Sequence, residues 1–163
     1  MIIPNLSRLI NRELASLCDE LRAYPDERAI WALPPGIPNS AGTLTLHLIG
    51  NLRAYIGANY GATGYVRDRP AEFARRDVPR ADLIHEIGIA ADEVTRALAL
   101  FDEALLETPF PQEVGGLRLP TGRFLQHLAS HLAYHLGQVD YHRRVVTGNA
   151  VSVGTLPLAP IAL

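Results

Sequence analysis

The sequence of 163 residues contains a single cysteine, Cys18, so the chain cannot form an internal disulfide bond. One thiol in a chain of this length is typical of a protein from a reducing compartment. No window approaches the roughly 18 uninterrupted apolar residues of a membrane span, and residues 1–7 show no basic region followed by an apolar run. We therefore expect a soluble, cytoplasmic protein that does not associate with a membrane.

The sequence also lacks an excess of positive charge, since 15 basic residues face 17 acidic ones and the net charge is −2. Proteins that bind nucleic acid usually carry a basic excess against the phosphates, so we expect no nucleic-acid partner. The hydrophobic content of 48% and the charged content of 20% exclude a disordered chain. Length and composition predict one globular domain over residues 1–163.

No segment alternates apolar and polar residues as a half-buried strand does, whereas four segments repeat apolar residues at helical spacing. We predict helices over about residues 5–24, 41–58, 79–106 and 121–147. Pro25 ends the first, and Ser40 or Asn39 can cap the second. The sequence thus predicts an all-α protein, a four-helix bundle with a long crossover connection between its second and third helices. The apolar tail, residues 150–163, contains Pro157 and Pro160 and cannot form a long helix.

The long connection, residues 57–80, is rich in glycine and arginine. It could form a lid, and its arginines, among them Arg67 and Arg69, could hold an anionic substrate. The simpler interpretation is a solvated segment, because Asp68, Glu72 and Asp77 alternate with these arginines.

The last predicted helix places histidines where leucines would be expected. Spacings of 4, 3, 4, 3 and 4 residues put a set of side chains on one face of this helix, namely Phe124, Leu128, His131, His135, Gln138 and His142. This pattern predicts a face that points into the core. A buried imidazole without a partner is costly, and a metal ion is the leading candidate for that partner.

Two histidines four residues apart on a helix can reach one ion, which makes His131 and His135 candidate ligands. His47 is the only other histidine on a predicted buried face and could supply a third. Zn²⁺ and Ni²⁺ both accept imidazole nitrogen, and three histidines leave a coordination position open, as in catalytic sites. The spacing also permits His127 with His131, but His142 is too far from His135, at about 10 Å along the axis.

Two amides follow the candidate ligands by one helical turn. Asn51 follows His47 and Gln138 follows His135. Either side chain could hold a bound water or orient a ligand from behind. His85 falls off the apolar face of its helix, so we expect it at the surface. The sequence disfavours a ferritin-like di-metal site, because no Glu-x-x-His pair lies on a predicted buried face.

Three stretches resemble the DinB-like (damage-inducible) superfamily of metal-binding four-helix bundles. They are Asn39–His47 with the following Asn51-Leu-Arg53, Arg67–Phe73, and His131-Leu-Ala-Tyr-His135-Leu-Gly137-Gln138. The resemblance extends to about residue 146. It implies that His47, His131 and His135 bind a divalent metal, which decides against His127, and that the protein forms a homodimer.

The resemblance also implies a range of activities. Some members are metal-dependent transferases or isomerases that use low-molecular-weight thiols such as bacillithiol or mycothiol, so we expect a small-molecule substrate and a thiol cosubstrate. Hydrolysis usually needs a carboxylate base, and the histidine face offers none, since Asp140 points away from it. The alternative is a non-catalytic, stress-associated binding module that the metal stabilises. No catalytic residue is assigned.

Overall fold

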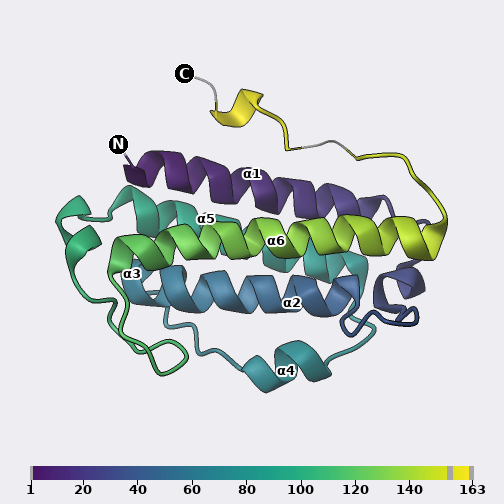
Figure 1. Cartoon of the computed structure of the whole chain (residues 1–163), viewed down its shortest axis with the longest axis horizontal. Helices are drawn as coiled ribbons and strands as arrows, with labels where there is room; N and C mark the ends of the chain where they lie inside the picture. The colour runs from purple at the N-terminus through teal and green to yellow at the C-terminus, as the bar shows by residue number, and fades with distance from the viewer. Residues whose placement is uncertain (1, 154–155, 162–163) are drawn as a thin grey trace.

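The computed structural model describes residues 2–153 and 156–161. Within these ranges the secondary structure is helical apart from two isolated bridges, Pro109 with Pro120 and Val114 with Leu117. The long helices lie side by side (Figure 1) and are α1 (Ile2–Arg22), α2 (Ala41–Leu52), α5 (Arg80–Ala99) and α6 (Thr121–Thr147). The predicted all-α class is confirmed. No described helix is both long enough and apolar enough to cross a membrane.

Several element boundaries differ from the prediction. The helix predicted over 41–58 continues beyond α2 through a π-helical turn (Arg53–Ala58) and α3 (Asn59–Gly61). The helix predicted over 79–106 is too long, because α5 ends at Ala99. There the Asp102 side chain accepts a hydrogen bond from the backbone of Ala104 and starts a separate 3-10 helix, Glu103–Glu107. Shorter 3-10 helices span Glu27–Trp31 and Ala159–Ile161.

The helix α2 is buried along its whole length. It packs against α5 and α6, and also against α4 (Arg69–Ala74), a short helix inside the long connection for which the sequence predicts no helix. Ser40 starts α2 by accepting a hydrogen bond from the backbone of Thr43. Two glycines of α2 allow side chains of other segments to approach its backbone. A Cβ at Gly42 would lie 2.7 Å from the Trp31 ring, and a Cβ at Gly50 would collide with the Glu72 carboxylate. A histidine on α2 is therefore held in a fixed environment.

The core face of α6 is turned away from the predicted one. Leu128, Leu132, Leu136 and Val139 point into the core, whereas His131 and His135 are only partly buried at its edge and Gln138 is exposed. Each residue step turns the direction of the side chain by about 100° around the helix axis. Leu132 and Leu136, which directly follow His131 and His135, therefore point most directly into the core. The prediction of a core-facing position is wrong for His131, His135 and Gln138, because burying leucine is favourable and burying imidazole is costly. It holds for Phe124, Leu128 and His142, which are buried.

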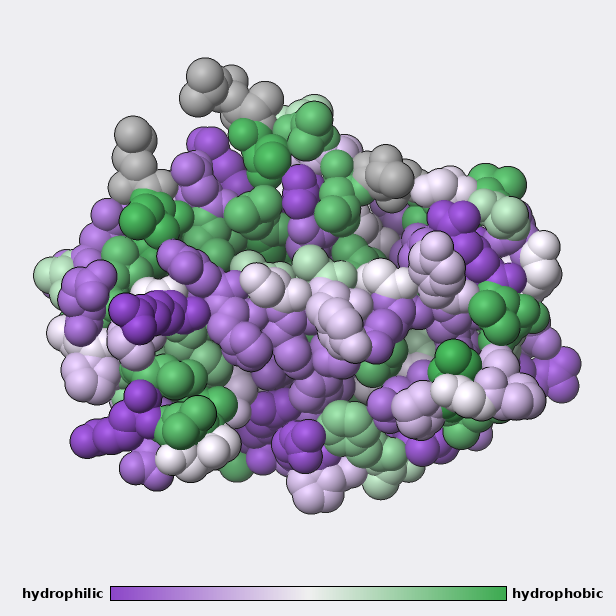
Figure 2. Space-filling model, viewed as in Figure 1, coloured by the Kyte–Doolittle hydropathy of each residue, from purple (hydrophilic) through white to green (hydrophobic). Residues whose placement is uncertain are grey.

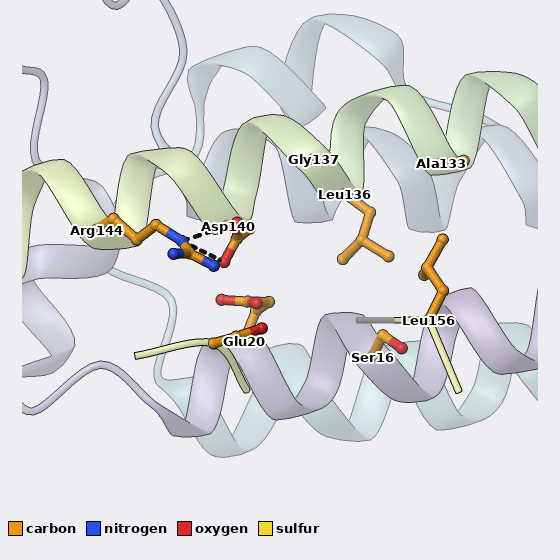
Figure 3. A pocket seen from close by; sticks show the side chains of 9 residues that line it. Ser16, Glu20, Ala133, Leu136, Gly137, Asp140, Arg144 and Leu156 are labelled. Carbon is orange, nitrogen blue, oxygen red and sulfur yellow. Dashed lines mark hydrogen bonds and ion pairs between the residues drawn. The ribbon is translucent and has the colours of Figure 1, made fainter. Parts of the chain in front are cut away.

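A buried ion cluster joins α1, α6 and the tail. The Arg143 side chain is 1% exposed and donates to Glu20 Oε2 at 2.5 Å and to Asp140 Oδ1 at 3.1 Å. It also donates to the carbonyl oxygen of Val151, and Arg144 donates to that of Ala150, which holds the start of the tail. Beside this cluster, α1, α6 and the tail enclose a cavity of about 280 Å³ (Figure 3).

The tail leaves apolar side chains at the surface. Val151, Leu156, Leu158 and Ile161 are each at least 36% exposed. Figure 2 shows hydrophobic residues gathered along the edge where α1 and the tail lie, whereas hydrophilic residues cover the middle of the face where α6 lies in Figure 1. As expected, the tail forms no long helix in its described part.

We predict that Arg143→Leu lowers the free energy of unfolding by about 3–5 kcal/mol, because it leaves the buried carboxylate of Glu20 without its cation. Chemical denaturation measures the change. Arg22→Leu is the matched control, since Arg22 pairs with Asp19 at the surface, where both side chains are more than half exposed. We expect it to cost less than about 1 kcal/mol. Equal losses in the two variants would contradict a stabilising role for the cluster.

Candidate metal centre

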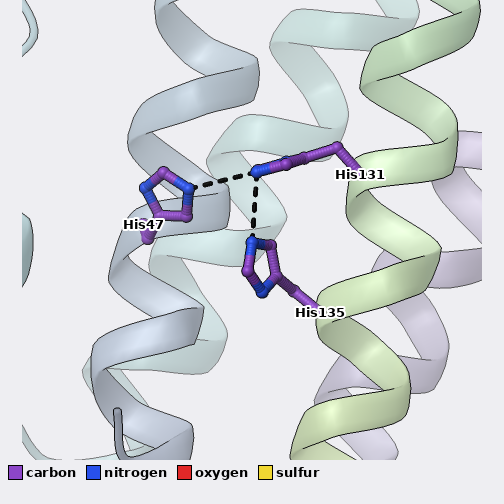
Figure 4. A group of neighbouring side chains, drawn as sticks. All are labelled: His47, His131 and His135. Carbon is purple, nitrogen blue, oxygen red and sulfur yellow. Dashed lines mark hydrogen bonds between the residues drawn. The ribbon is translucent and has the colours of Figure 1, made fainter. Parts of the chain in front are cut away.

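Three imidazoles meet between α2 and α6 (Figure 4). His47 comes from α2, and His131 and His135 come from adjacent turns of α6. The Nε2 atom of His131 lies 3.3 Å from Nε2 of His47 and 3.1 Å from Nε2 of His135. The structure thus brings together the three histidines that the sequence analysis selected, as a group that could hold a metal ion.

The spacing of these nitrogens fits a metal ion. Two nitrogens bound tetrahedrally to one Zn²⁺ at 2.0–2.1 Å lie about 3.3 Å apart. The two Nε2 separations around His131 are close to this value, and the ligand atoms of all three residues lie within 4.8 Å of one another. The two separations around His131 thus match those of ligands on one tetrahedral ion.

The tautomer of His47 is fixed by a carboxylate. Its Nδ1 lies 2.9 Å from Glu72 Oε2, and Glu72 also accepts two hydrogen bonds from the Arg67 guanidinium, at 2.7 and 2.9 Å. Burial alone would raise the pKa of Glu72, but the hydrogen bonds from His47 and Arg67 lower it below its usual value. Glu72 is therefore ionised and acts as acceptor, so Nδ1 of His47 donates to it and Nε2 is the atom that faces His131.

Burial disfavours the charged form of the other two imidazoles, His131 and His135. Nδ1 of His135 donates to Oε1 of Gln138 at 2.6 Å, which leaves its Nε2 with a lone pair. Burial and the neighbouring imidazoles of His135 and His47 lower the pKa of His131 to about 4. Burial also lowers the pKa of His135, although the hydrogen bond with Gln138 opposes this shift. His131 Nε2 thus faces the Nε2 atoms of both His47 and His135, and a cation between them would satisfy all three nitrogens.

Glu72 is the functional side chain that the sequence analysis missed. It is 6% exposed and reaches His47 because Asp68 caps α4 and Gly50 leaves room for the carboxylate on α2. The interpretation of the connection as solvated charge is wrong for Arg67 and Glu72. Gly50 lies three residues after His47 on the same helical face. A glycine at this position indicates that another segment packs closely against α2 there, which is how the sequence could have pointed to Glu72.

The remaining candidates have other surroundings. Asn51 is buried, and its Oδ1 has no hydrogen-bond partner among the described residues. His127 is exposed and stacks on Phe124, with ring centroids 6.0 Å apart. His142 is occupied elsewhere, because its Nδ1 accepts from the Tyr24 hydroxyl and its Nε2 donates to the carbonyl of Ala32. His85 is exposed, as expected.

Aromatic side chains border the centre. The Phe73 ring of α4 lies 5.1 Å from the His47 ring, and Arg67 lies 5.3 Å above the Tyr55 ring. Tyr55 and Phe124 pack edge to face with each other and with Phe110. Tyr55, Phe110 and Phe124 thus form an aromatic cluster that Arg67 connects to the centre through its contact with Tyr55.

We predict that Glu72→Gln weakens the affinity for Zn²⁺ by about 10- to 100-fold, because the charge that orients His47 and raises its basicity is lost. Competition with a chromophoric chelator measures the affinity. Glu86→Gln is the control, since its carboxylate lies on α5 and makes only a 3.9 Å contact with Arg75. Unchanged affinity in Glu72→Gln would show that the carboxylate does not support the centre.

We predict opposite effects from two substitutions of helical glycines. Gly88→Ala should stabilise the fold by about 1 kcal/mol through helix propensity, since a Cβ at Gly88 meets nothing within 4 Å. Gly50→Ala should destabilise it and weaken Zn²⁺ binding, because the new methyl group displaces Glu72. Denaturation curves and chelator competition test both effects. A gain in stability at position 50 with unchanged affinity would contradict this assignment.

Comparison with known proteins assigns the chain to a family. The model of the DinB superfamily matches residues 9–139, a range that includes the three histidines, Glu72 and Gln138. Neither the curated proteins nor the solved structures contain a match. Because the matched range exceeds half of the chain, the chain belongs to the DinB superfamily.

Proposed function

We propose that the protein is a metal-dependent thiol transferase or isomerase whose divalent ion is held by His47, His131 and His135. The supporting observation is the convergence of three Nε2 atoms, with the Nδ1 atoms of His47 and His135 committed to Glu72 and Gln138. Three imidazole ligands suit Zn²⁺ or Ni²⁺ and leave a position for a substrate.

The metal, when bound, would supply a Lewis acid that lowers the pKa of a thiol. The chain's own residues perform the other tasks. Glu72 and Arg67 orient His47, and Gln138 orients His135. The Phe73 ring packs against His47 and covers part of its imidazole.

Two arrangements disfavour other reactions. The Glu72 carboxylate contacts His47, but its hydrogen bonds with His47 and Arg67 already occupy it. It is therefore not free to act as the base of a hydrolase. Arg67 and Arg53 make bidentate pairs with Glu72 and Glu93, so neither is free to hold an anionic substrate. A small thiol and an uncharged electrophile therefore fit better. A cytoplasmic location and a homodimer stay predictions.

A non-catalytic binding module is the alternative. The hydrogen bond between His47 and Glu72 would then serve stability alone, because a metal that binds only the folded state stabilises it. The two functions differ in turnover and not in metal binding, so an assay of thiol transfer separates them.

The test loads the protein with Zn²⁺ or Ni²⁺ and measures transfer of low-molecular-weight thiols to 1-chloro-2,4-dinitrobenzene. The thiol sulfur bonds to the ring carbon, chloride leaves, and the thiol proton passes to the solvent. We expect a rate above the uncatalysed reaction that falls at least about tenfold in His135→Ala, while His85→Ala, at an exposed position on α5, keeps it. Metal-dependent stabilisation without turnover for any thiol tested would favour the binding module.

A further inference from the structure

A second cavity lies beside the metal centre, in the groove between α2 and α6. Its volume is about 230 Å³. It is lined by Ile37, Pro38, Asn39, Leu44, Gln138, Tyr141, His142 and Val145. Most of these side chains are apolar or aromatic, and none of them is an Asp, Glu, Lys or Arg. The lining therefore suits an uncharged, apolar group.

The position of this cavity follows from the two helices. Leu44 precedes His47 by three residues and Gln138 follows His135 by three, so each lies about 4.5 Å from its histidine along the helix axis. Because α2 and α6 run in opposite directions (Figure 1), both displacements point the same way along the groove. The cavity is thus the next layer of the groove that holds the histidines.

Gln138 is shared between the cavity and the centre. Its Oε1 accepts the hydrogen bond from His135, and the same side chain lines the cavity. Its amide nitrogen and the side chain of Asn39 keep hydrogen-bonding capacity on this wall. A ligand that extends from the histidines into the cavity would therefore pass over two neutral amides and meet no charge.

His142 gives the cavity a fixed wall. Its Nδ1 accepts from the Tyr24 hydroxyl at 2.7 Å and its Nε2 donates to the carbonyl of Ala32 at 2.8 Å. Both ring nitrogens are satisfied and the residue is 3% exposed, so the ring has no reason to turn into the cavity. The space is consequently preformed and does not depend on a rotamer change of this side chain.

We propose that this cavity receives the apolar end of the substrate whose other end reaches the metal centre. The proposal rests on the proposed function and adds the substrate class: a molecule with a metal-binding head and a short uncharged apolar group. The volume of about 230 Å³ is below the range of pockets that enclose a drug-sized ligand, so the cavity accommodates only part of the molecule.

The larger cavity in Figure 3 cannot take this role. Its α6 lining includes Ala133, Gly137 and Asp140, which at 100° per residue lie on the side of the helix opposite His131 and His135. The tail residues Ser152 and Leu156 also line it. A ligand there would be separated from the histidines by the helix itself.

The test titrates the Co²⁺-loaded protein with ethanethiol, butanethiol and hexanethiol and follows the sulfur-to-cobalt charge-transfer absorption. We expect the affinity to rise about threefold to fourfold for each methylene group that becomes buried, until the cavity is filled. Val145→Trp places an indole at the cavity rim, where Val145 is 59% exposed, and should abolish the dependence on chain length. Val151→Trp, at a 68% exposed position in the tail, is the matched control and should keep it.

Each outcome is decisive. Affinity that does not depend on chain length in the unmodified protein, or the same dependence in Val145→Trp, would overturn the inference and leave the metal centre intact. Absence of the cobalt d–d bands would instead reject the proposed function, and the inference with it. Thermal unfolding of both tryptophan variants checks that the fold is retained.

Discussion

The hydrogen bond between His47 and Glu72 is the interaction on which the centre depends. It joins α2 to α4 through two residues that are 25 positions apart in the sequence, and it fixes which nitrogen of His47 faces His131. Arg67 holds the same carboxylate and keeps it ionised, as the lowered pKa of Glu72 shows. Without this pair, His47 could present either tautomer, and a buried imidazole on an otherwise buried helix would have no charged partner.

The fold supplies the conditions for that interaction. Because α2 is covered on all sides, His47 cannot turn towards solvent, and Gly50 provides the space into which the Glu72 side chain fits. The histidines of α6 behave differently, since they lie at the edge of the core and leave one side of the centre accessible. A rigid donor from α2 facing two partly buried donors from α6 is the arrangement expected of a centre that admits a small ligand.

The sequence predicts the helical class well, because the apolar period along residues 6–21 and 121–147 is long and regular. It selects His47, His131 and His135 through their helical spacing and through the family resemblance, and Gln138 through its place one turn after His135. It does not reveal Glu72, because the approach of α4 to α2 is a tertiary contact and the surrounding charges resemble a solvated loop. It also misplaces the core face of α6, since His131 and Leu132 both continue a helical period and only packing decides between them.

Metal content tests the central claim most directly. The untagged protein and the His131→Ala variant would be purified identically, exposed to Zn²⁺ or Ni²⁺, and analysed for bound metal by elemental analysis. Three convergent imidazoles predict about one ion per chain in the unmodified protein and its loss in the variant. Absence of metal from both samples, or equal metal in both, would contradict a three-histidine centre.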